Sequence, residues 1–303
     1  PVTSETVPEG NVTYYAHWIV DCEGFENDSW STIATNAETN PTRYAVGCTR
    51  PLVMDFDNDG TNETYTLRVV NNTTPTECST QGFSQSACGL VIEFADIITM
   101  RTMNPYNDGS SNGDGSKGGW EYSDLRAFLN STKYTAGNVD YSTTGIYNKL
   151  PSDLRSKIIT TTVVSGYGTN DNKNFITTDK LYLLSPRELW IEDGSSFIGH
   201  GDDTGWDLTR QLDYYNEKGV TTKKYSEVIK KYNGSDTSWW LRTASLGSDV
   251  VFFNARDDGG RNYSSVLINK GVSPAFRVGN RYTVEFNANG GEVSTTSKEI
   301  VPG

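Results

Sequence analysis

The residues best suited to chemistry form an acidic stretch in the amino-terminal part of the chain. It reads Asp55-x-Asp57-x-Asp59-x-x-x-Glu63, with a glycine directly after the third aspartate. Carboxylates at alternate positions of a turn supply the oxygen ligands that Ca²⁺ prefers. The twelfth position, where an EF-hand loop carries glutamate, is Thr66, so the stretch does not fit a helical EF-hand. Two interpretations remain: a calcium loop between strands with these four acids as ligands, or a hairpin whose acids are solvated.

A polar and aromatic hairpin in the carboxyl-terminal part is the second candidate site. The run Asp257-Asp258-Gly259-Gly260 is a turn signal between two β-forming segments. A two-residue loop gives the hairpin one apolar face, which is expected to be core, and one face suited to binding. A three-residue loop would reverse these faces. The predicted core residues are Val251, Phe253, Ala255, Val266 and Ile268. The predicted contacts are Phe252, Asn254, Arg256, Arg261, Tyr263 and Ser265.

Two consecutive tryptophans, Trp239 and Trp240, precede this hairpin. Neighbouring residues of a strand point to opposite faces, so one ring is expected in the core. The other, Trp240, would then be an exposed platform for a sugar or a protein. The alternative is that both rings are buried. Arg242, two residues further on, is expected to brace a loop carboxylate rather than to touch a ligand.

The chain lacks the residue patterns of a hydrolase. Its two histidines are His17 and His200, and no G-x-S-x-G nucleophile motif is present. Acidic residues are so numerous that a glycosidase pair cannot be identified by sequence. We therefore predict a binding protein and not an enzyme, with a carbohydrate-active enzyme or a structural spacer as alternatives.

The overall composition limits the partners. A net charge of −12 and a pI near 4.7 argue against nucleic acid and against anionic membrane surfaces. No run of about 18 apolar residues predicts a membrane span. Hydrophobic residues make up only 35%, but 17 Tyr, 7 Trp and 11 Phe can fill a core. Both ends of the chain are strand-like, and we interpret it as a segment of a longer protein.

The four cysteines are expected to form disulfides. They are Cys22, Cys48, Cys78 and Cys88, and none belongs to a C-x-x-C pair typical of zinc sites. Of the three connectivities, we favour the local one, Cys22 with Cys48 and Cys78 with Cys88; buried free thiols are the alternative. Disulfides would imply an oxidising compartment.

The remaining elements must hold these sites in place. Periodicity and turn signals predict both strands and helices, in the order typical of an α+β fold. Ser185-Pro186-Arg187-Glu188 is a strong helix start, with Ser as N-cap and Glu at the third position. Strands are predicted at residues 44–56, 63–70 and 90–99. Helical segments are predicted at residues 122–130, at the apolar stripe of Leu150, Leu154 and Ile158, and at 225–232, ending at Asn233-Gly234.

The two ends of the chain resemble halves of one repeat. Residues 11–18, ending in Tyr-Ala-His-Trp, resemble the closing strand of an internalin-B-type repeat, and residues 282–291, containing Phe-Asn-Ala-Asn-Gly-Gly, resemble its opening strand and turn. The resemblance implies three parts: the end of one β-repeat at 1–19, a central domain at 20–280, and the start of the next repeat at 281–303. It also implies a stalk on a bacterial surface protein.

A second resemblance covers roughly residues 45–280. The ordered motifs are Gly119-Trp120-x-x-Ser123-x-Leu125-Arg126-x-Phe128-Leu129-Asn130, Leu183-Leu184-Ser185, Trp240-Leu241-Arg242 and Gly271-Val272-x-Pro274-Ala275-Phe276. They are similar to an uncharacterised domain of bacterial surface proteins that looks like a C-type-lectin-type fold. That domain is related in pattern to formylglycine-generating-enzyme-like domains and to receptors diversified by retroelements. The resemblance implies that residues 245–269 form an exposed ligand-binding region.

The chain departs from these families in two ways. The calcium- and sugar-binding Glu-Pro-Asn or Gln-Pro-Asp motif of animal C-type lectins is absent. All four cysteines precede residue 89, whereas formylglycine-generating enzymes use cysteines in the carboxyl-terminal half. We therefore expect the fold without that activity: an extracellular adhesin or receptor module on a bacterial surface that binds a glycan or a protein.

Overall fold

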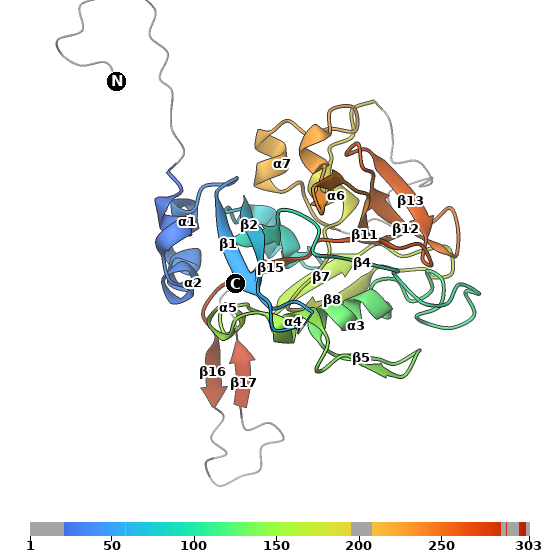
Figure 1. The fold of residues 1–303 in the computed structure, drawn as a ribbon, viewed down its shortest axis with the longest axis horizontal. Helices are drawn as coiled ribbons and strands as arrows, with labels where there is room; N and C mark the ends of the chain where they lie inside the picture. The colour runs from blue at the N-terminus through green and yellow to red at the C-terminus, as the bar shows by residue number, and fades with distance from the viewer. Residues whose placement is uncertain (1–20, 58, 195–207, 286–288, 290–296, 301–303) are drawn as a thin grey trace, which may run out of the picture.

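The computed structural model describes residues 21–57, 59–194, 208–285, 289 and 297–300 (Figure 1). Helices and strands are mixed along this part of the chain, as the predicted α+β class requires. No helix among the described residues is long and apolar enough to cross a membrane. The Tyr-Ala-His-Trp segment, residues 1–19 as a whole, and most of the Phe-Asn-Ala-Asn-Gly-Gly turn lie outside the described residues.

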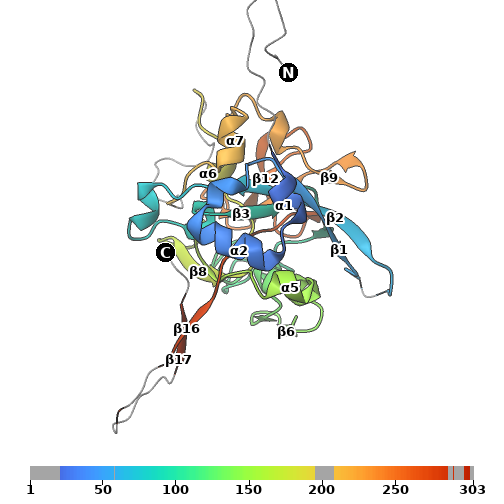
Figure 2. The same cartoon turned by 90° about the vertical axis from the view of Figure 1, so that its left-hand side faces the viewer.

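The amino-terminal part consists of two helices that pack against the first sheet (Figure 2). They are α1 (Glu23–Asn27) and α2 (Trp30–Thr39), followed by a 3₁₀ turn at Pro41–Arg43. The Ser29 side chain caps α2 by accepting the backbone N–H of Thr32 at 3.1 Å. Neither helix was predicted, although Trp30, Ile33, Ala34 and Ala37 of α2 have the i, i+3, i+4, i+7 spacing of an apolar helix face.

The first sheet has four antiparallel strands in the order β1 (Thr49–Met54), β2 (Glu63–Asn71), β3 (Val91–Phe94) and β15 (Ala275–Arg277). The three strand predictions at 44–56, 63–70 and 90–99 therefore hold with shifted ends. The β1–β2 hairpin extends from the body of the molecule and carries the acidic stretch between its strands (Figure 2). β15 contains the end of the Gly271 motif, so distant segments of the chain meet in this sheet.

The second sheet has five strands in the order β13 (Arg261–Ser265), β12 (Val251–Ala255), β11 (Trp239–Ala244), β14 (Lys270–Val272) and β4 (Thr99–Arg101). Only the pair β11–β14 is parallel. The two tryptophans and the predicted binding hairpin thus belong to one sheet. β11 and β12 are interior strands of it, and β13 lies at one edge.

Smaller elements connect and flank the two sheets. The strand pairs are β5 (Lys133–Tyr134) with β6 (Val139–Asp140), β7 (Thr161–Ser165) with β8 (Phe175–Asp179), β9 (Lys231–Tyr232) with β10 (Ser235–Asp236), and β16 (Tyr282–Glu285) with β17 (Ser297–Ile300). The helices are α3 (Asp124–Asn130), α4 (Ile146–Lys149), α5 (Ser152–Arg155), α6 (Pro186–Leu189) and α7 (Asp213–Glu217). Further 3₁₀ turns lie at Thr76–Ser79, Gln85–Ala87 and Ser226–Val228.

Two predicted helices are corrected. The segment 225–232 holds one 3₁₀ turn and then enters β9, because Asn233 and Gly234 have φ of 50° and 81° and make a tight hairpin turn to β10. The stripe of Leu150, Leu154 and Ile158 is not one helix: Leu150 follows the end of α4, Leu154 lies in α5 and Ile158 in a strand bridge, since Pro151 interrupts the helix. The predicted start at Ser185 is confirmed: α6 begins at Pro186, and the Ser185 backbone N–H donates to the Glu188 carboxylate at 2.9 Å.

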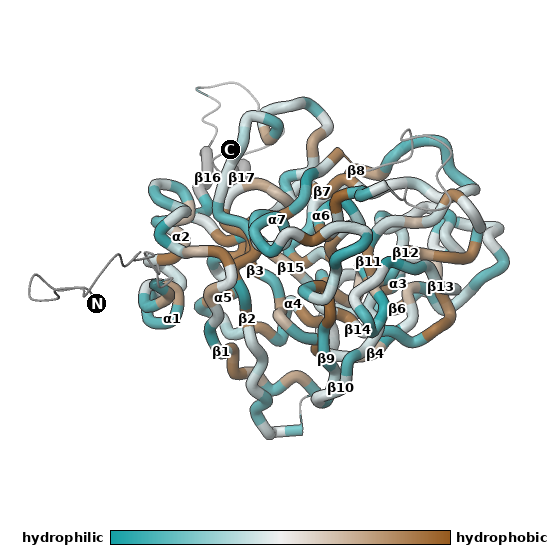
Figure 3. The backbone as a smooth tube through the Cα atoms, turned by 90° about the horizontal axis from the view of Figure 1, so that it is seen from above, coloured by the Kyte–Doolittle hydropathy of each residue, from teal (hydrophilic) through white to brown (hydrophobic). Residues whose placement is uncertain are grey.

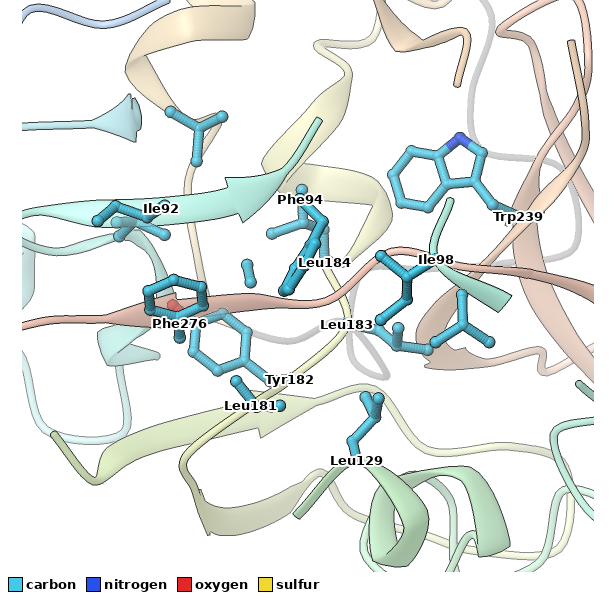
Figure 4. Close-up of a cluster of buried hydrophobic side chains, with 14 of the residues drawn as sticks. Ile92, Phe94, Ile98, Leu129, Leu181, Tyr182, Leu183, Leu184, Trp239 and Phe276 are labelled. Atoms are coloured by element: carbon cyan, nitrogen blue, oxygen red, sulfur yellow. The ribbon is translucent and has the colours of Figure 1, made fainter. Parts of the chain in front are cut away.

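The core lies between the sheets and includes the segment Leu181, Tyr182, Leu183 and Leu184, which is fully buried (Figure 4). In Figure 3 the hydrophobic stretches gather towards the inner strands and the hydrophilic ones towards the outer loops. Both predicted disulfides are present, Cys22–Cys48 and Cys78–Cys88, and no free cysteine remains.

The buried Arg242 guanidinium makes a two-pronged ion pair with Glu188 of α6, at 2.6 and 2.7 Å. Both side chains are 0% exposed. The prediction that Arg242 braces a carboxylate is therefore correct, although that carboxylate lies on a helix and not in a loop. The pair joins β11 of the second sheet to the amino-terminal end of α6.

Candidate functional site

The β12–β13 hairpin has a three-residue loop, Asp257–Gly259, and not the two-residue loop used for the predicted faces. The backbone N–H of Arg256 donates to the Gly260 carbonyl at 2.7 Å, and Gly259 has a φ of 84°. The register consequently pairs Phe253 with Tyr263. The faces of β13 are reversed relative to the prediction, as a one-residue change in loop length requires. The predicted face assignment is wrong for this reason.

Three of the seven predicted contact residues are buried and cannot meet a ligand directly. Trp240, Phe252 and Asn254 are each 0% exposed. They lie on β11 and β12, which have neighbours on both sides in the sheet and are covered on both faces. The indole N–H of Trp240 donates to the Arg101 carbonyl at 2.9 Å, and Trp239 is also 0% exposed. The alternative in which both tryptophans belong to the core is therefore correct.

The other four predicted contacts lie at or near the surface. Arg256 is exposed and pairs with Asp258 at 2.9 Å, and Tyr263 is 46% exposed. Arg261 and Ser265 are partly buried. Arg261 and Tyr263 line a shallow depression of about 170 Å³. Of the predicted core residues, Ile268 is 50% exposed, because the chain turns away from the sheet after Val266.

The acidic stretch forms the loop between β1 and β2. Asp55, Asp57 and Glu63 each offer a carboxylate oxygen, and these oxygens lie within 4.8 Å of one another. Asp59 does not join them. Its backbone N–H donates to the Asp55 and Asp57 carboxylates, while its own carboxylate accepts the N–H of Thr61 at 2.6 Å. The predicted ligand set is thus reduced to three residues, which could hold a cation together with backbone or water oxygens.

The acidic loop forms one wall of a groove of about 690 Å³, and the β9–β10 hairpin forms the opposite wall. We call it the aromatic groove. Its lining contains partly buried rings, three carboxylates and one ammonium group. These residues are Phe56, Asp57, Glu63, Thr64, Tyr65, Thr66, Phe94, Asp96, Ile97, Ile98, Thr99, Lys231, Tyr232, Asn233 and Gly234.

A series of edge-to-face ring contacts fixes the floor of the aromatic groove. It runs from Phe276 in the core to Phe94 at 6.4 Å, on to Tyr65 at 6.1 Å and then to Phe56 at 6.1 Å, measured between ring centroids. Each such contact adds about 0.5–1.5 kcal/mol to simple burial. Lys149 holds the outer end, since its ammonium lies 5.0 Å from the Phe56 ring centroid and bonds the Phe56 carbonyl. The ring positions are therefore set by the core.

The Tyr65 hydroxyl is a neutral donor in the groove. Burial raises its pKa to about 12, and the negative charges of Glu63 and Asp57 act in the same direction. No hydrogen bond joins this hydroxyl to another residue in the described part of the chain. The groove thus combines apolar ring faces with a free hydroxyl donor and carboxylate acceptors.

A buried ion cluster holds the β9–β10 wall. The Lys230 ammonium, just before β9, donates to the Glu93 carboxylate at 2.7 Å, the Phe94 carbonyl at 2.6 Å and the Ser273 hydroxyl at 2.8 Å. Next to it, the Lys231 backbone N–H donates to Asp96 at 2.9 Å. These bonds fix the hairpin wall to β3 and to the turn that follows it.

This groove was not predicted from the sequence. Its acidic wall was visible as a possible metal loop, but nothing in the sequence indicated that the wall faces β9. The signal that could have found the second wall was Asn233-Gly234, which is the strongest short hairpin signal when β-forming residues flank it. We interpreted it as the end of a helix, and the hairpin was missed.

Fold and site together define a mixed α+β domain with two disulfides and an open, aromatic and acidic groove. The chain belongs to a family described as a domain of unknown function, DUF6273, whose model matches residues 94–279. A search of curated proteins and a search of solved structures each gave no match. The matched range includes the β9–β10 wall and the β12–β13 hairpin, whereas the acidic loop precedes it.

Proposed function

We propose that this chain is an extracellular binding module of a bacterial surface protein, and that it binds a neutral glycan in the aromatic groove. The groove carries the proposal: its rings are fixed by the core, and its polar groups are displayed around them. Sugar rings have apolar faces that stack on aromatic side chains, and hydroxyls that bond to carboxylates and amides. The enzyme and spacer alternatives are decided by the experiment below.

The charge of the groove supports a neutral ligand. Asp57, Glu63 and Asp96 line it, against one cation, Lys231. The chain as a whole carries a net charge of −12. An anionic glycan or a nucleic acid would be repelled by such a lining, whereas hydroxyls of a neutral sugar can donate to these carboxylates.

We extend the proposal to calcium at the acidic loop. Three carboxylate oxygens within 4.8 Å of one another supply part of the six to eight oxygens that Ca²⁺ takes. Asp57 and Glu63 also line the groove, so a bound ion would order one of its walls. Calcium would then strengthen glycan binding without being essential to the fold.

The extracellular setting and the relationship to known folds are part of the same proposal. Two disulfides favour an oxidising compartment. We further propose that residues 20–280 have a C-type-lectin-like fold between internalin-B-type repeats. The support is the ordered motif string, whose Trp240 and Gly271 strands lie side by side as β11 and β14.

The test is glycan-array screening of the purified chain with and without calcium, followed by calorimetry on any neutral glycan that binds. Tyr232→Ala removes a ring from the groove wall, and Tyr65→Phe removes only the free hydroxyl. We expect each to weaken binding about tenfold, equivalent to one lost contact of about 1.4 kcal/mol. Tyr263→Ala on the hairpin is the matched control and should bind as the wild type does.

Each other outcome refutes part of the proposal. Loss of binding in Tyr263→Ala with normal binding in Tyr232→Ala would move the site to the hairpin. Cleavage of a bound glycan during long incubation would make the protein an enzyme. Absence of binding to every neutral glycan, with and without calcium, would leave the spacer role as the better account.

A further inference from the structure

A second pocket lies on a part of the molecule that the proposed function does not use. It has a volume of about 340 Å³ and is formed by α2, the loop closed by the Cys78–Cys88 disulfide, and the end of β15. We call it the Arg277 pocket. Its polar lining comprises Glu38, Thr74, Ser79, Gln85 and Arg277, and it shares no lining residue with the aromatic groove.

The Arg277 guanidinium has no anionic partner among the described residues. It makes neither an ion pair nor a hydrogen bond there, and its Nε is buried without a partner. By contrast, Arg68, Arg126 and Arg242 each pair with a buried carboxylate. A guanidinium stays charged in proteins, so its partial burial without a counterion is costly. An unpaired cation facing a pocket is a group that a ligand anion can satisfy.

Burial also lowers the pKa of Arg277, and the one side chain that acts on it electrostatically is Tyr182. Burial raises the pKa of the Tyr182 hydroxyl well above its ordinary value, so this hydroxyl stays neutral near pH 7. It donates to the Ser86 carbonyl at 3.3 Å. Tyr182 therefore does not neutralise the guanidinium.

The pocket is built so that the guanidinium lies against the backbone. Gly89 has a φ of 69°, and a Cβ placed there would be 3.2 Å from Nη2 of Arg277 and 3.7 Å from the Thr74 hydroxyl. Glycine adopts this backbone conformation without strain, and a larger residue here would crowd the guanidinium. The Cys78–Cys88 disulfide fixes the residue directly before Gly89. The pocket thus holds a guanidinium fork next to a hydroxyl donor.

We propose that the Arg277 pocket binds the carboxylate group of a small organic acid. The planar guanidinium matches a planar carboxylate in two parallel hydrogen bonds, and Thr74 supplies a further donor. Glu38 also lines the pocket and bonds to the backbone N–H of Asn280 at 2.7 Å. Its negative charge favours a singly charged carboxylate over a doubly charged phosphate or sulfate.

The test is NMR titration of the full chain with sodium glucuronate and sodium acetate, with glucose as the neutral control and phosphate and sulfate as the competing anions. Carboxylates should shift the Nε–H resonance of Arg277 in a saturable way, and glucose should not. A shift produced by phosphate or sulfate but not by carboxylates would overturn the ligand class. Absence of a shift with every anion would overturn the site.

Variants locate the binding independently of the resonance. Arg277→Met keeps the length of the side chain but removes its charge, and we expect at least about a tenfold loss of glucuronate affinity. Thr74→Val should cause a smaller loss. Because Arg277 satisfies no described carboxylate and its burial is costly, Arg277→Met should fold and be at least as stable as the wild type in urea. Unchanged affinity in Arg277→Met, or a marked loss of its stability, would show that Arg277 is structural.

Discussion

Replacement of Glu93 by glutamine should cost this protein a large part of its stability. Glu93 is 1% exposed and lies on β3 between the buried Lys230 ammonium and the Arg68 guanidinium, whose side chain is 15% exposed. Its carboxylate accepts the Arg68 guanidinium Nε–H at 2.9 Å, the Lys230 ammonium at 2.7 Å and the Tyr215 hydroxyl at 3.1 Å. Glu93→Gln keeps the shape of the side chain, but it leaves the buried Lys230 and the partly buried Arg68 without their anion.

The expected loss is about 3–5 kcal/mol, the cost of removing one partner from a buried ion pair. This loss is a large fraction of the folding free energy of a typical protein, which is only about 5–15 kcal/mol. Since Lys230 precedes the β9–β10 hairpin, the same variant should loosen one wall of the aromatic groove. Glycan affinity should therefore fall together with stability.

The assay is urea unfolding followed by tryptophan fluorescence, with the matched control Glu77→Gln at an exposed site. The control should change stability by no more than about 0.5 kcal/mol. Lys230→Met and the double variant Glu93→Gln/Lys230→Met complete a cycle, in which the double variant should lose less than the sum of the single losses. A loss below about 1 kcal/mol for Glu93→Gln, or strictly additive losses, would refute the reasoning.

The dependence of the unfolding free energy on acidic pH tests the same ion cluster around Glu93. Burial opposes ionisation of Glu93, but the charges of Lys230 and Arg68 outweigh it and hold the pKa of Glu93 below its ordinary value. Its ionised form therefore contributes stability above about pH 4.5, and this contribution is lost as the pH falls through the lower folded-state pKa. Glu93→Gln should remove that part of the acid dependence. An unchanged pH profile between pH 5 and pH 2 would contradict this account.

Three further predictions concern the acidic loop, the disulfides and Tyr65. Calcium should bind to the wild type in calorimetry and raise its melting temperature, whereas Asp57→Asn should weaken both effects; equal heats would exclude this loop as the site. Removing Cys22–Cys48, which spans 26 residues, by a double change to serine should lower stability in urea by about 2–5 kcal/mol, and no loss would show that the bridge is dispensable. The raised pKa of Tyr65, about 12, means that its stabilisation is complete below pH 10 and is lost as the pH rises towards 12. Stability measured from pH 9 to pH 12 should fall less steeply in Tyr65→Phe, and identical slopes would contradict a raised pKa.

Sequence patterns predicted a structural feature correctly where residues close together in the chain determine that feature. Ser185, Pro186 and Glu188 mark the start of α6, where Glu188 accepts the Ser185 backbone N–H, and short sequence separation favoured the observed cysteine pairs. Asn233-Gly234 was misinterpreted because the same dipeptide can end a helix or turn a hairpin. The positive φ of both residues belongs to the hairpin turn. The apolar spacing of α2 was visible in the sequence and was overlooked, whereas α1 has only five residues and depends on its packing against β1.

The candidate site was less predictable because it depends on contacts between distant segments. Whether Phe252 faces a ligand follows from the length of one turn and from the strands on either side of β12. Asp257-Asp258-Gly259-Gly260 accommodates loops of two or three residues, and the choice reverses the faces of the hairpin. The three-residue form occurs here with Gly259 as the residue at positive φ, a common solution in hairpins.

Alternation along a strand separates core from surface only when one face of the sheet is open. β11 is fully buried along its length, so the opposite orientations of Trp239 and Trp240 say nothing about exposure. The same interior position gives Arg242 its buried partner Glu188. The side chains that can contact a ligand therefore lie at the edges of the sheets and at the ends of the hairpins. The acidic loop and the β9–β10 turn are two such ends, and both line the aromatic groove. In this fold the buried interior strands position the hairpins, and the residues at the hairpin ends would determine ligand specificity.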